Sequence, residues 1–159
     1  MKPVRVSVDV PTAREAVYDF LDVMANHERF TDHFLTDWEC SGPARGVGSR
    51  ARVRARAGGR SEAIDIEVVS AEPPARNVEH GTSSGGRRLT TGTYLLEPLP
   101  DGGTRVTFEL AWRRAPLTER LAAPLVRAFV RRENARALQR LAERLAAADP
   151  EARPAVARG

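Results

Sequence analysis

The sequence predicts an α+β domain in which helices cover one face of an antiparallel sheet. Three observations support this fold class. The N-terminal residues alternate apolar and polar side chains as a strand does, residues 34–113 repeat short strand-like segments between turn sequences, and residues 116–148 are rich in alanine, leucine and arginine as a long helix is. The 159 residues suit one domain, which we expect at residues 1–148, followed by a disordered tail at 149–159.

The first strand and the helix after it follow from two sequence patterns. Valine occupies every second position of Val4–Val10, which is typical of a strand with one buried face. Thr12 and Glu15 have the spacing of a capping box, so we expect a helix from about residue 13 to 24. A short second helix is expected within residues 26–30. The expected buried face of the first helix comprises Ala16, Val17, Phe20, Leu21 and Met24.

The middle of the chain is predicted to form six further strands, and its clearest feature is a hairpin. Gly58-Gly59 is typical of a two-residue turn between antiparallel strands. One face of this hairpin is then apolar and the other carries opposite charges, as a sheet with one wet side requires. We therefore interpret the arginines at 50, 52, 54 and 56 as a solvated strand face rather than a phosphate-binding patch. The register pairs Val53 with Ile64, Ala51 with Ile66, Arg52 with Asp65, and Arg50 with Glu67.

The C-terminal helix is expected to run from about residue 124 to 147, after either a kink or a separate short helix, because a proline suits its first turn. Such a helix would be roughly 35 Å long, enough to cross a small domain. Arg127 and Asn134 fall near the centre of its apolar stripe, where either side chain could hydrogen-bond a ligand. A rotation that turns Leu125 and Phe129 inward would instead leave Arg127 at the surface. The stripe comprises Val126, Val130, Ala137, Leu138, Leu141 and Leu145.

The net positive charge is concentrated in the C-terminal part of the chain. Residues 1–114 hold equal numbers of basic and acidic side chains, whereas residues 115–159 hold nine arginines against five acidic side chains. Phe129 is the one aromatic residue of that segment, so the pattern is unlike a nucleic-acid-binding surface, and we expect no nucleic-acid partner. Every fourth residue from Arg132 to Arg144 is arginine. This row predicts a solvated face, or alternatively a surface for an acidic partner or a membrane surface.

Residues with distinctive chemistry are sparse. Cys40 is the one cysteine, and the N-terminal segment lacks the continuous apolar stretch of a secretory signal, so we expect a cytoplasmic protein without an internal disulfide. No apolar run is long enough to span a bilayer. His27, His33 and His80 have no ligand-like spacing, so we expect no metal site. The glycines of Gly46-Val47-Gly48 precede a strand rather than a helix, and we expect no cofactor.

Five segments stand in an order and at spacings that are fairly specific when taken together. They are Val8–Leu21 (VDVPTAREAVYDFL), Ser41–Arg50 (SGPARGVGSR), Val68–Pro74 (VVSAEPP), Thr91–Pro98 (TGTYLLEP) and Gly102–Leu110 (GGTRVTFEL). With the long helix after them, they resemble the START-like or Bet v 1-like (SRPBCC) superfamily, in particular bacterial members of the polyketide cyclase/dehydrase type. The resemblance covers about residues 3–147.

This resemblance implies the helix-grip fold. In that fold a curved seven-stranded antiparallel sheet wraps around the long C-terminal helix and leaves a cavity for an apolar small molecule. The sequence agrees with a cavity, because a closed core would carry larger aliphatic side chains than the presumed inner face does. The small or polar residues of that face are Ala51, Ala55, Thr82, and Thr91 or Thr93.

The candidate site residues are polar and aromatic side chains that strand alternation places on the inner face. Glu62 lies in step with the isoleucines of its strand, and His80 and Thr82 lie in step with Val78. An inward Glu and an inward His could act as general base and acid on a ligand carbonyl, and Tyr94 is a third candidate for proton transfer. Alternatively, Glu62 reaches solvent at the sheet edge and His80 is an ordinary core histidine. The expected ligand-binding residues are Trp38, Glu62, His80, Thr82, Tyr94, Trp112, Phe129 and Asn134.

Three functions are compatible with this sequence. The first is a binding or carrier protein for a hydrophobic small molecule such as a lipid, an isoprenoid or a polyketide, because a cavity is implied without a convincing catalytic set. The second is a metal-free cyclase or dehydratase that acts on an aromatic or polyketide-like substrate. The third is an interaction protein that uses the arginine row. The sequence leaves open whether the protein is a monomer or a homodimer.

Overall fold

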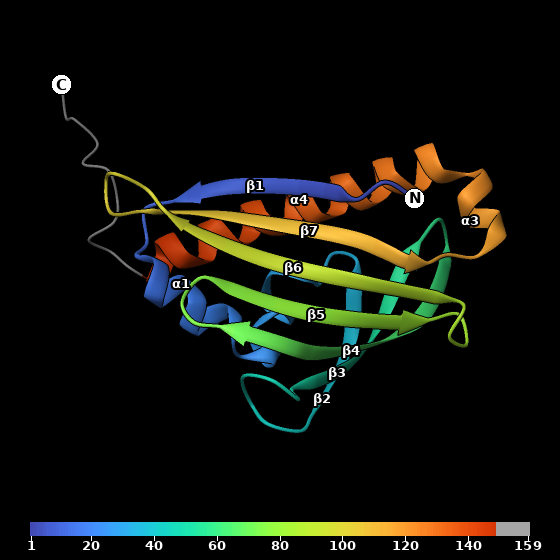
Figure 1. Cartoon of the computed structure of the whole chain (residues 1–159), viewed down its shortest axis with the longest axis horizontal. Coiled ribbons are helices and arrows are strands. Elements are labelled where there is room, and N and C mark those ends of the chain that lie inside the picture. The colour runs from blue at the N-terminus through green and yellow to red at the C-terminus, as the bar shows by residue number, and fades with distance from the viewer. Residues whose placement is uncertain (149–159) are drawn as a thin grey trace.

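Residues 1–148 are described by a computed structural model, in which a curved seven-stranded antiparallel sheet lies against one long helix (Figure 1). The strand order is β1-β7-β6-β5-β4-β3-β2, so the strands from β2 to β7 each pair with the next along the chain, and β1 joins β7. This is the predicted helix-grip fold. The tail predicted at residues 149–159 lies outside the described residues. The strands are β1 (Val4–Val10), β2 (Leu35–Ser41), β3 (Arg50–Ala57), β4 (Arg60–Glu72), β5 (Arg76–Ser83), β6 (Arg88–Pro98) and β7 (Thr104–Arg114).

Helices fill the connection after β1 and the end of the chain, as predicted. The connection holds α1 (Arg14–Leu21), a 3-10 turn (Met24–Asn26) and α2 (Glu28–Thr31), and β7 is followed by α3 (Leu117–Leu121) and α4 (Ala123–Ala148). Of the two alternatives left open before the main helix, the structure has the separate short helix, α3. None of the helices within the described residues is long and apolar enough to span a membrane.

The start of α1 differs from the predicted capping box of Thr12 and Glu15. Ala13 is the N-cap residue, and no side chain hydrogen-bonds to this helix end. Thr12 is instead buried, and its carbonyl oxygen accepts a hydrogen bond of 2.7 Å from Thr104 Oγ1. The chain entering α1 is therefore tied to β7 rather than capped locally. Ala16, predicted on the buried face of this helix, is exposed.

The β3–β4 hairpin has the predicted register. Val53 pairs with Ile64 and Arg52 with Asp65, and the turn residues Gly58-Gly59 have φ values of 54° and 76°. Glycine adopts positive φ without strain, which is why this dipeptide suits the turn. On the outer face Arg52 lies 3.7 Å from Asp65, so the predicted charge pairing across the strands is confirmed there.

The main core lies under the second half of α4. Ala137, Leu138, Leu141 and Leu145 are buried there in one cluster with residues of α1, β1, β6 and β7. Within α4, whose residues are all described, none before Glu133 is buried. Val126 and Val130 of the predicted stripe are accordingly only half-buried. The first half of the helix thus adds little to the core and covers the cavity described below. A smaller cluster consists of Met24, Ala51, Val53 and Val68.

The arginine row of α4 is only partly a solvated face. Arg140 is half-buried and pairs with Asp32, just beyond α2, at 2.5 Å. Arg144 Nε donates to the carbonyl oxygen of Arg29 in α2, also at 2.5 Å. These contacts form because the short helix α2 packs beside α4. Two members of the row therefore connect α4 to the segment between β1 and β2.

Candidate functional site

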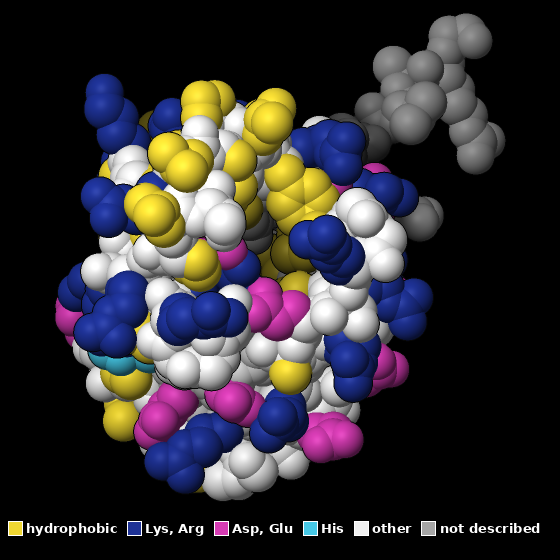
Figure 2. Space-filling model, turned by 90° about the vertical axis from the view of Figure 1, so that its right-hand side faces the viewer, with side chains coloured by type: hydrophobic (Ala, Val, Ile, Leu, Met, Phe, Trp, Pro, Cys, Tyr) yellow, Lys and Arg dark blue, Asp and Glu magenta, His cyan; other side chains and the backbone are white. Residues whose placement is uncertain are grey.

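A cavity of about 770 Å³ lies between the concave face of the sheet and the first half of α4. Its volume falls within the roughly 300–1,000 Å³ of small-molecule sites. Figure 2 shows a hollow on the face of the molecule that carries α3, with hydrophobic side chains gathered beside it. Leu117 and Leu121 of α3 and Leu125 of α4 are large hydrophobic side chains that are exposed, and Leu125 also lines the cavity. We call this end the mouth.

Small residues leave the middle of the cavity open. Ala55, Gly81, Thr90 and Gly92 line it from β3, β5 and β6. A Cβ atom at Gly92 would lie 3.1 Å from the ring of Phe108, so glycine is what allows that ring to pack over β6. The walls around this space are mainly apolar. Their larger members include Trp38, Tyr94, Phe108, Leu110, Trp112 and Phe129.

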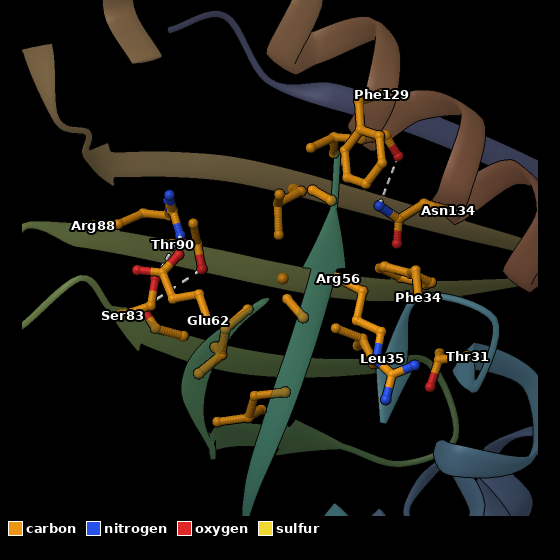
Figure 3. Close-up of a pocket in the computed structure, with 18 of the residues that line it drawn as sticks. Thr31, Phe34, Leu35, Arg56, Glu62, Ser83, Arg88, Thr90, Phe129 and Asn134 are labelled. Atoms are coloured by element: carbon orange, nitrogen blue, oxygen red, sulfur yellow. Dashed lines mark hydrogen bonds and ion pairs between the residues drawn. The ribbon is translucent and has the colours of Figure 1, made fainter. Parts of the chain in front are cut away.

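A network of charged side chains lies at the mouth, where Figure 3 shows Arg88, Glu62 and Ser83 together. Arg88 of β6 donates hydrogen bonds to Glu62 of β4, to both carboxylate oxygens of Glu119 in α3, and to Ser83 Oγ at 2.8 Å. Burial tends to raise the pKa of Glu62, but hydrogen bonds from Ser84 and Arg88 outweigh burial and lower it. Glu62 is therefore ionised and binds Arg88. Arg88 in turn binds Glu119, which connects α3 to the sheet.

A buried acid lines the cavity from the neighbouring strand, β5. Glu79 is 8% exposed, and its Oε1 lies 3.5 Å from His27 Nδ1. That oxygen has no hydrogen-bond partner among the described residues. His27 Nε2 lies 2.7 Å from the carbonyl oxygen of Leu21, which can only accept, so Nε2 carries a proton. Neutral His27 then presents an unprotonated Nδ1, and the pair is placed to share one proton.

The surroundings of Glu79 favour its protonated form. Burial raises the pKa of Glu79, and the neighbouring His27 opposes this rise. The ring of Tyr94 meets the His27 ring edge-on, with 5.6 Å between centroids. Burial, and then the charge of Glu79, raise the pKa of Tyr94 well above its usual value. The cavity wall thus holds a phenol that stays protonated and a carboxyl group that keeps its proton to higher pH than an exposed glutamate does.

A comparison with protein families identifies the chain. The family model for polyketide cyclase/dehydrase and lipid transport matches residues 1–146. The chain belongs to this family. Among curated proteins, none is significantly similar to it.

Solved structures share the fold of this member of the polyketide cyclase/dehydrase and lipid transport family. TTHA0849 from Thermus thermophilus is 24% identical over 93% of this chain and 99% of its own, with a TM-score of 0.74. DynU16, from the dynemicin biosynthetic locus, is 21% identical over 97% of this chain and 50% of its own, with a TM-score of 0.64. Ara h 8.0201 is 11% identical over 92% of this chain and 98% of its own, with a TM-score of 0.65. At these identities the likeness concerns the fold.

Most of the residues expected at the site of this family member lie at the cavity. Those that line it are Trp38, Glu62, Tyr94, Trp112, Phe129 and Asn134. Their role in binding stays a prediction. Within residues 1–148 no group of three or more His, Cys, Asp or Glu side chains could hold a metal ion.

His80 and Thr82 do not line the cavity, so the inward orientation predicted for them is wrong. Glu79, Gly81 and Ser83 line it instead. The physical reason is that the cavity-facing positions of β5 are all polar or small. The rule that apolar residues face inward, applied to a valine of this strand, therefore selects the wrong face. Thr91 and Thr93 are misplaced in the same way, because the lining residues of β6 include Thr90, Gly92 and Tyr94.

The orientation of α4 about its own axis has features of both predicted alternatives: Asn134 faces the cavity, as in the first, and so do Leu125 and Phe129, as in the second. Arg127 Nε donates to the carbonyl oxygen of Lys2 at 3.1 Å and does not line the cavity. Leu125 and Phe129 line it, and so does Asn134, which Figure 3 shows beside Phe129. Asn134 Nδ2 donates to the carbonyl oxygen of Val130 at 2.8 Å, so Oδ1 is the atom that can accept a hydrogen bond from a ligand.

Sequence reasoning missed His27, Glu79 and Arg88 as site residues. For Glu79 a signal existed, because it stands between a valine and a histidine within a predicted strand. Glutamate is rarely buried unless it is paired, so a glutamate at such a position indicates either an exposed side chain or a buried one with a partner. For His27 and Arg88 no local pattern points to a partner. Their partners lie on other elements, which only the fold brings together.

Proposed function

We propose that this protein binds a hydrophobic small molecule, such as a lipid, an isoprenoid or a polyketide, and carries it without a chemical step. The supporting observation is the cavity of about 770 Å³ with mainly apolar walls and an open mouth. Protein interiors are normally packed as densely as organic crystals, so an apolar space of this size suits an apolar occupant. The description of the family includes lipid transport, which is a role of the same kind.

Thermal unfolding with ligands from these three classes tests the proposal. A ligand at one hundred times its Kd stabilises the native state by about 2.7 kcal/mol, which is roughly 5–10 °C in Tm for a domain of this size. Thr90→Trp places bulk in the cavity, whereas Thr91→Trp changes a neighbouring residue that does not line it. We expect the Tm shift in the wild type and in Thr91→Trp, and its loss in Thr90→Trp. No shift with any ligand class would contradict the proposal.

Native mass spectrometry of protein purified from its own host addresses the identity of the ligand. A small molecule that is present in the native spectrum and absent after denaturation would name the ligand class directly. The mass would then guide which lining side chains to replace first.

The second candidate function is a cyclase or dehydratase that acts on a polyketide-like substrate, and the Glu79–His27 pair supports it. A protonated Glu79 next to a substrate carbonyl is suited to act as a general acid, and His27 Nδ1 is suited to take up a proton. Glu62 suits this role less well, because Arg88 holds it as a carboxylate at the mouth. His80 lies outside the cavity lining, and Tyr94 remains a proton donor.

Glu79→Gln separates this enzymatic role from binding alone. The assay follows conversion of a β-hydroxyketone analogue into its dehydrated product by mass spectrometry. If Glu79 is the general acid, its replacement lowers turnover by about 100-fold or more. The ligand-dependent Tm shift should persist, and Glu62→Gln should retain turnover. Absence of turnover in the wild type would favour the carrier.

A further inference from the structure

A second depression, of about 650 Å³, lies beside the cavity, between the β3–β4 hairpin and α4. Phe34, Ala57 and Phe129 line both spaces, and so do Arg56 and Arg60. The depression is therefore continuous with the apolar cavity. We call it the arginine groove, because five arginines from three elements line it. They are Arg54 and Arg56 of β3, Arg60 of β4, and Arg132 and Arg136 of α4.

Two of these arginines have carboxylate partners and three do not. Arg54 lies 3.4 Å from Asp37, and Arg132 lies 2.7 Å from Glu133. By contrast, the guanidinium groups at 56, 60 and 136 make no ion pair with any described residue. The groove thus carries uncompensated positive charge next to an apolar space.

The remaining titratable groups of the groove do not neutralise this charge. Glu133 is the one carboxylate among the described residues that line it, and this group already pairs with Arg132 and lies 3.5 Å from His33 Nε2. Burial lowers the pKa of His33, so the imidazole is neutral at pH 7 and adds no charge of its own. Three guanidinium groups are therefore available to bind an anionic ligand in the groove.

The β3–β4 hairpin shows that this lack of partners is local. Along its outer face, Arg50 stands opposite Glu67 and Arg52 opposite Asp65, with ion pairs of 3.0 and 3.7 Å. Towards the groove the acidic partners cease, because Arg56 stands opposite Ser61. Arg50 and Arg52 are thus neutralised across the strands, whereas Arg56, which lines both the groove and the cavity, has no acidic partner.

We infer that the arginine groove binds the anionic headgroup of an amphiphile whose apolar part occupies the cavity. Guanidinium groups bind carboxylate and phosphate oxygens through paired N–H donors, so the headgroup is a carboxylate or a phosphate. The inference rests on the proposed binding function and specifies the class of its ligand: an apolar body with one acidic end.

Displacement of the neutral fluorescent probe N-phenyl-1-naphthylamine tests the inference at low and high salt. The competitors are dodecanol, dodecanoate and dodecyl phosphate, which share one apolar chain and differ in the headgroup. We expect the anions to bind roughly tenfold more tightly than the alcohol at low salt, and this advantage to shrink at high salt because exposed charges are screened. Whichever anion binds more tightly identifies the headgroup.

Two double variants test whether the arginine groove causes the tighter binding of the anions. Arg56→Gln with Arg136→Gln should remove the advantage of the anions over dodecanol. Arg50→Gln with Arg52→Gln also removes two positive charges, both from β3 but outside the groove, and it should keep the advantage.

Three results would overturn the inference. They are equal affinities for alcohol and anions in the wild type, equal effects of the two double variants, and no effect of the groove variant. In each case the neutral probe would still bind, so the proposed carrier function would stand. If the neutral probe failed to bind and no ligand class raised the Tm, the carrier function would be refuted, and the inference with it.

Discussion

Replacing Arg88 by methionine should show how strongly the mouth network holds the fold together. The variant leaves two carboxylates, Glu62 and Glu119, without the guanidinium that lies between them, and their side chains are 34% and 16% exposed. Breaking a buried ion pair costs about 3–5 kcal/mol, whereas an exposed pair contributes about 0–1 kcal/mol. For partly exposed groups we expect a loss of about 2 kcal/mol in the free energy of unfolding, or roughly 4–8 °C in Tm.

Urea unfolding at pH 7 measures this loss, and Arg105→Met is the matched control. Arg105 makes two hydrogen bonds of 2.8 Å to Asp9, and both side chains are about half exposed. The control therefore removes the same charge and the same kind of paired hydrogen bond in better contact with solvent. We expect a clearly smaller loss of stability. Equal losses in the two variants would refute the reasoning, because burial would then not strengthen the network at the mouth.

The pH dependence gives a second check on the same network. The pKa of Glu62 is lowered in the folded protein, so ionised Glu62 adds stability above its unfolded pKa, and this contribution is lost as the pH falls through the folded pKa. The difference in stability between wild type and Arg88→Met should therefore shrink between pH 7 and about pH 3. A difference that is unchanged in acid would show that Glu62 is not stabilised by Arg88.

Three further predictions concern the core and the cavity wall. Leu141→Ala should lower the free energy of unfolding by about 3 kcal/mol in urea, because this side chain is fully buried, whereas Leu121→Ala, which changes an exposed side chain, should have little effect. Gly92→Ala should displace the Phe108 ring at a loss of about 1–3 kcal/mol and weaken ligand-induced stabilisation, and an unchanged Tm would contradict this. Because burial raises the pKa of Glu79, the wild type should lose stability as the pH rises above 4.5, and Glu79→Gln should abolish that loss in urea unfolding between pH 4.5 and 8.

The parts of the fold that could be predicted are those where several independent features of the sequence indicate the same structure. In the β3–β4 hairpin the Gly58-Gly59 turn, the apolar alternation and the charge pairing all give one register, and the structure has it. In β5 the same alternation was misleading, because Glu79, Gly81 and Ser83 face the cavity. A cavity wall need not be apolar, so the pattern that marks a core does not mark it.

The candidate site was predictable only where a residue could be placed from its own element. Trp112 lines the cavity, as its strand pattern indicated, and Phe129 lines it as one of the two helix rotations left open required. The mouth network joins β4, β6 and α3 through Arg88, and the Glu79–His27 pair joins β5 to the segment before α2. Such contacts depend on the curvature of the sheet, which no local pattern of side chains determines.

The core anchors α4 at one end only. Its second half is fixed by buried leucines and by the Arg140–Asp32 pair, whereas its first half has no buried residue within the described chain. A small tilt of the first half changes the room beside Val126 and Phe129 without disturbing the core. Ligands that differ in bulk at the mouth should therefore be tolerated. Glu79 instead lies on β5, which is paired with β4 and β6 in the sheet, so a tilt of α4 makes no room for added bulk next to it. We therefore expect the inner end to decide which shapes are accepted.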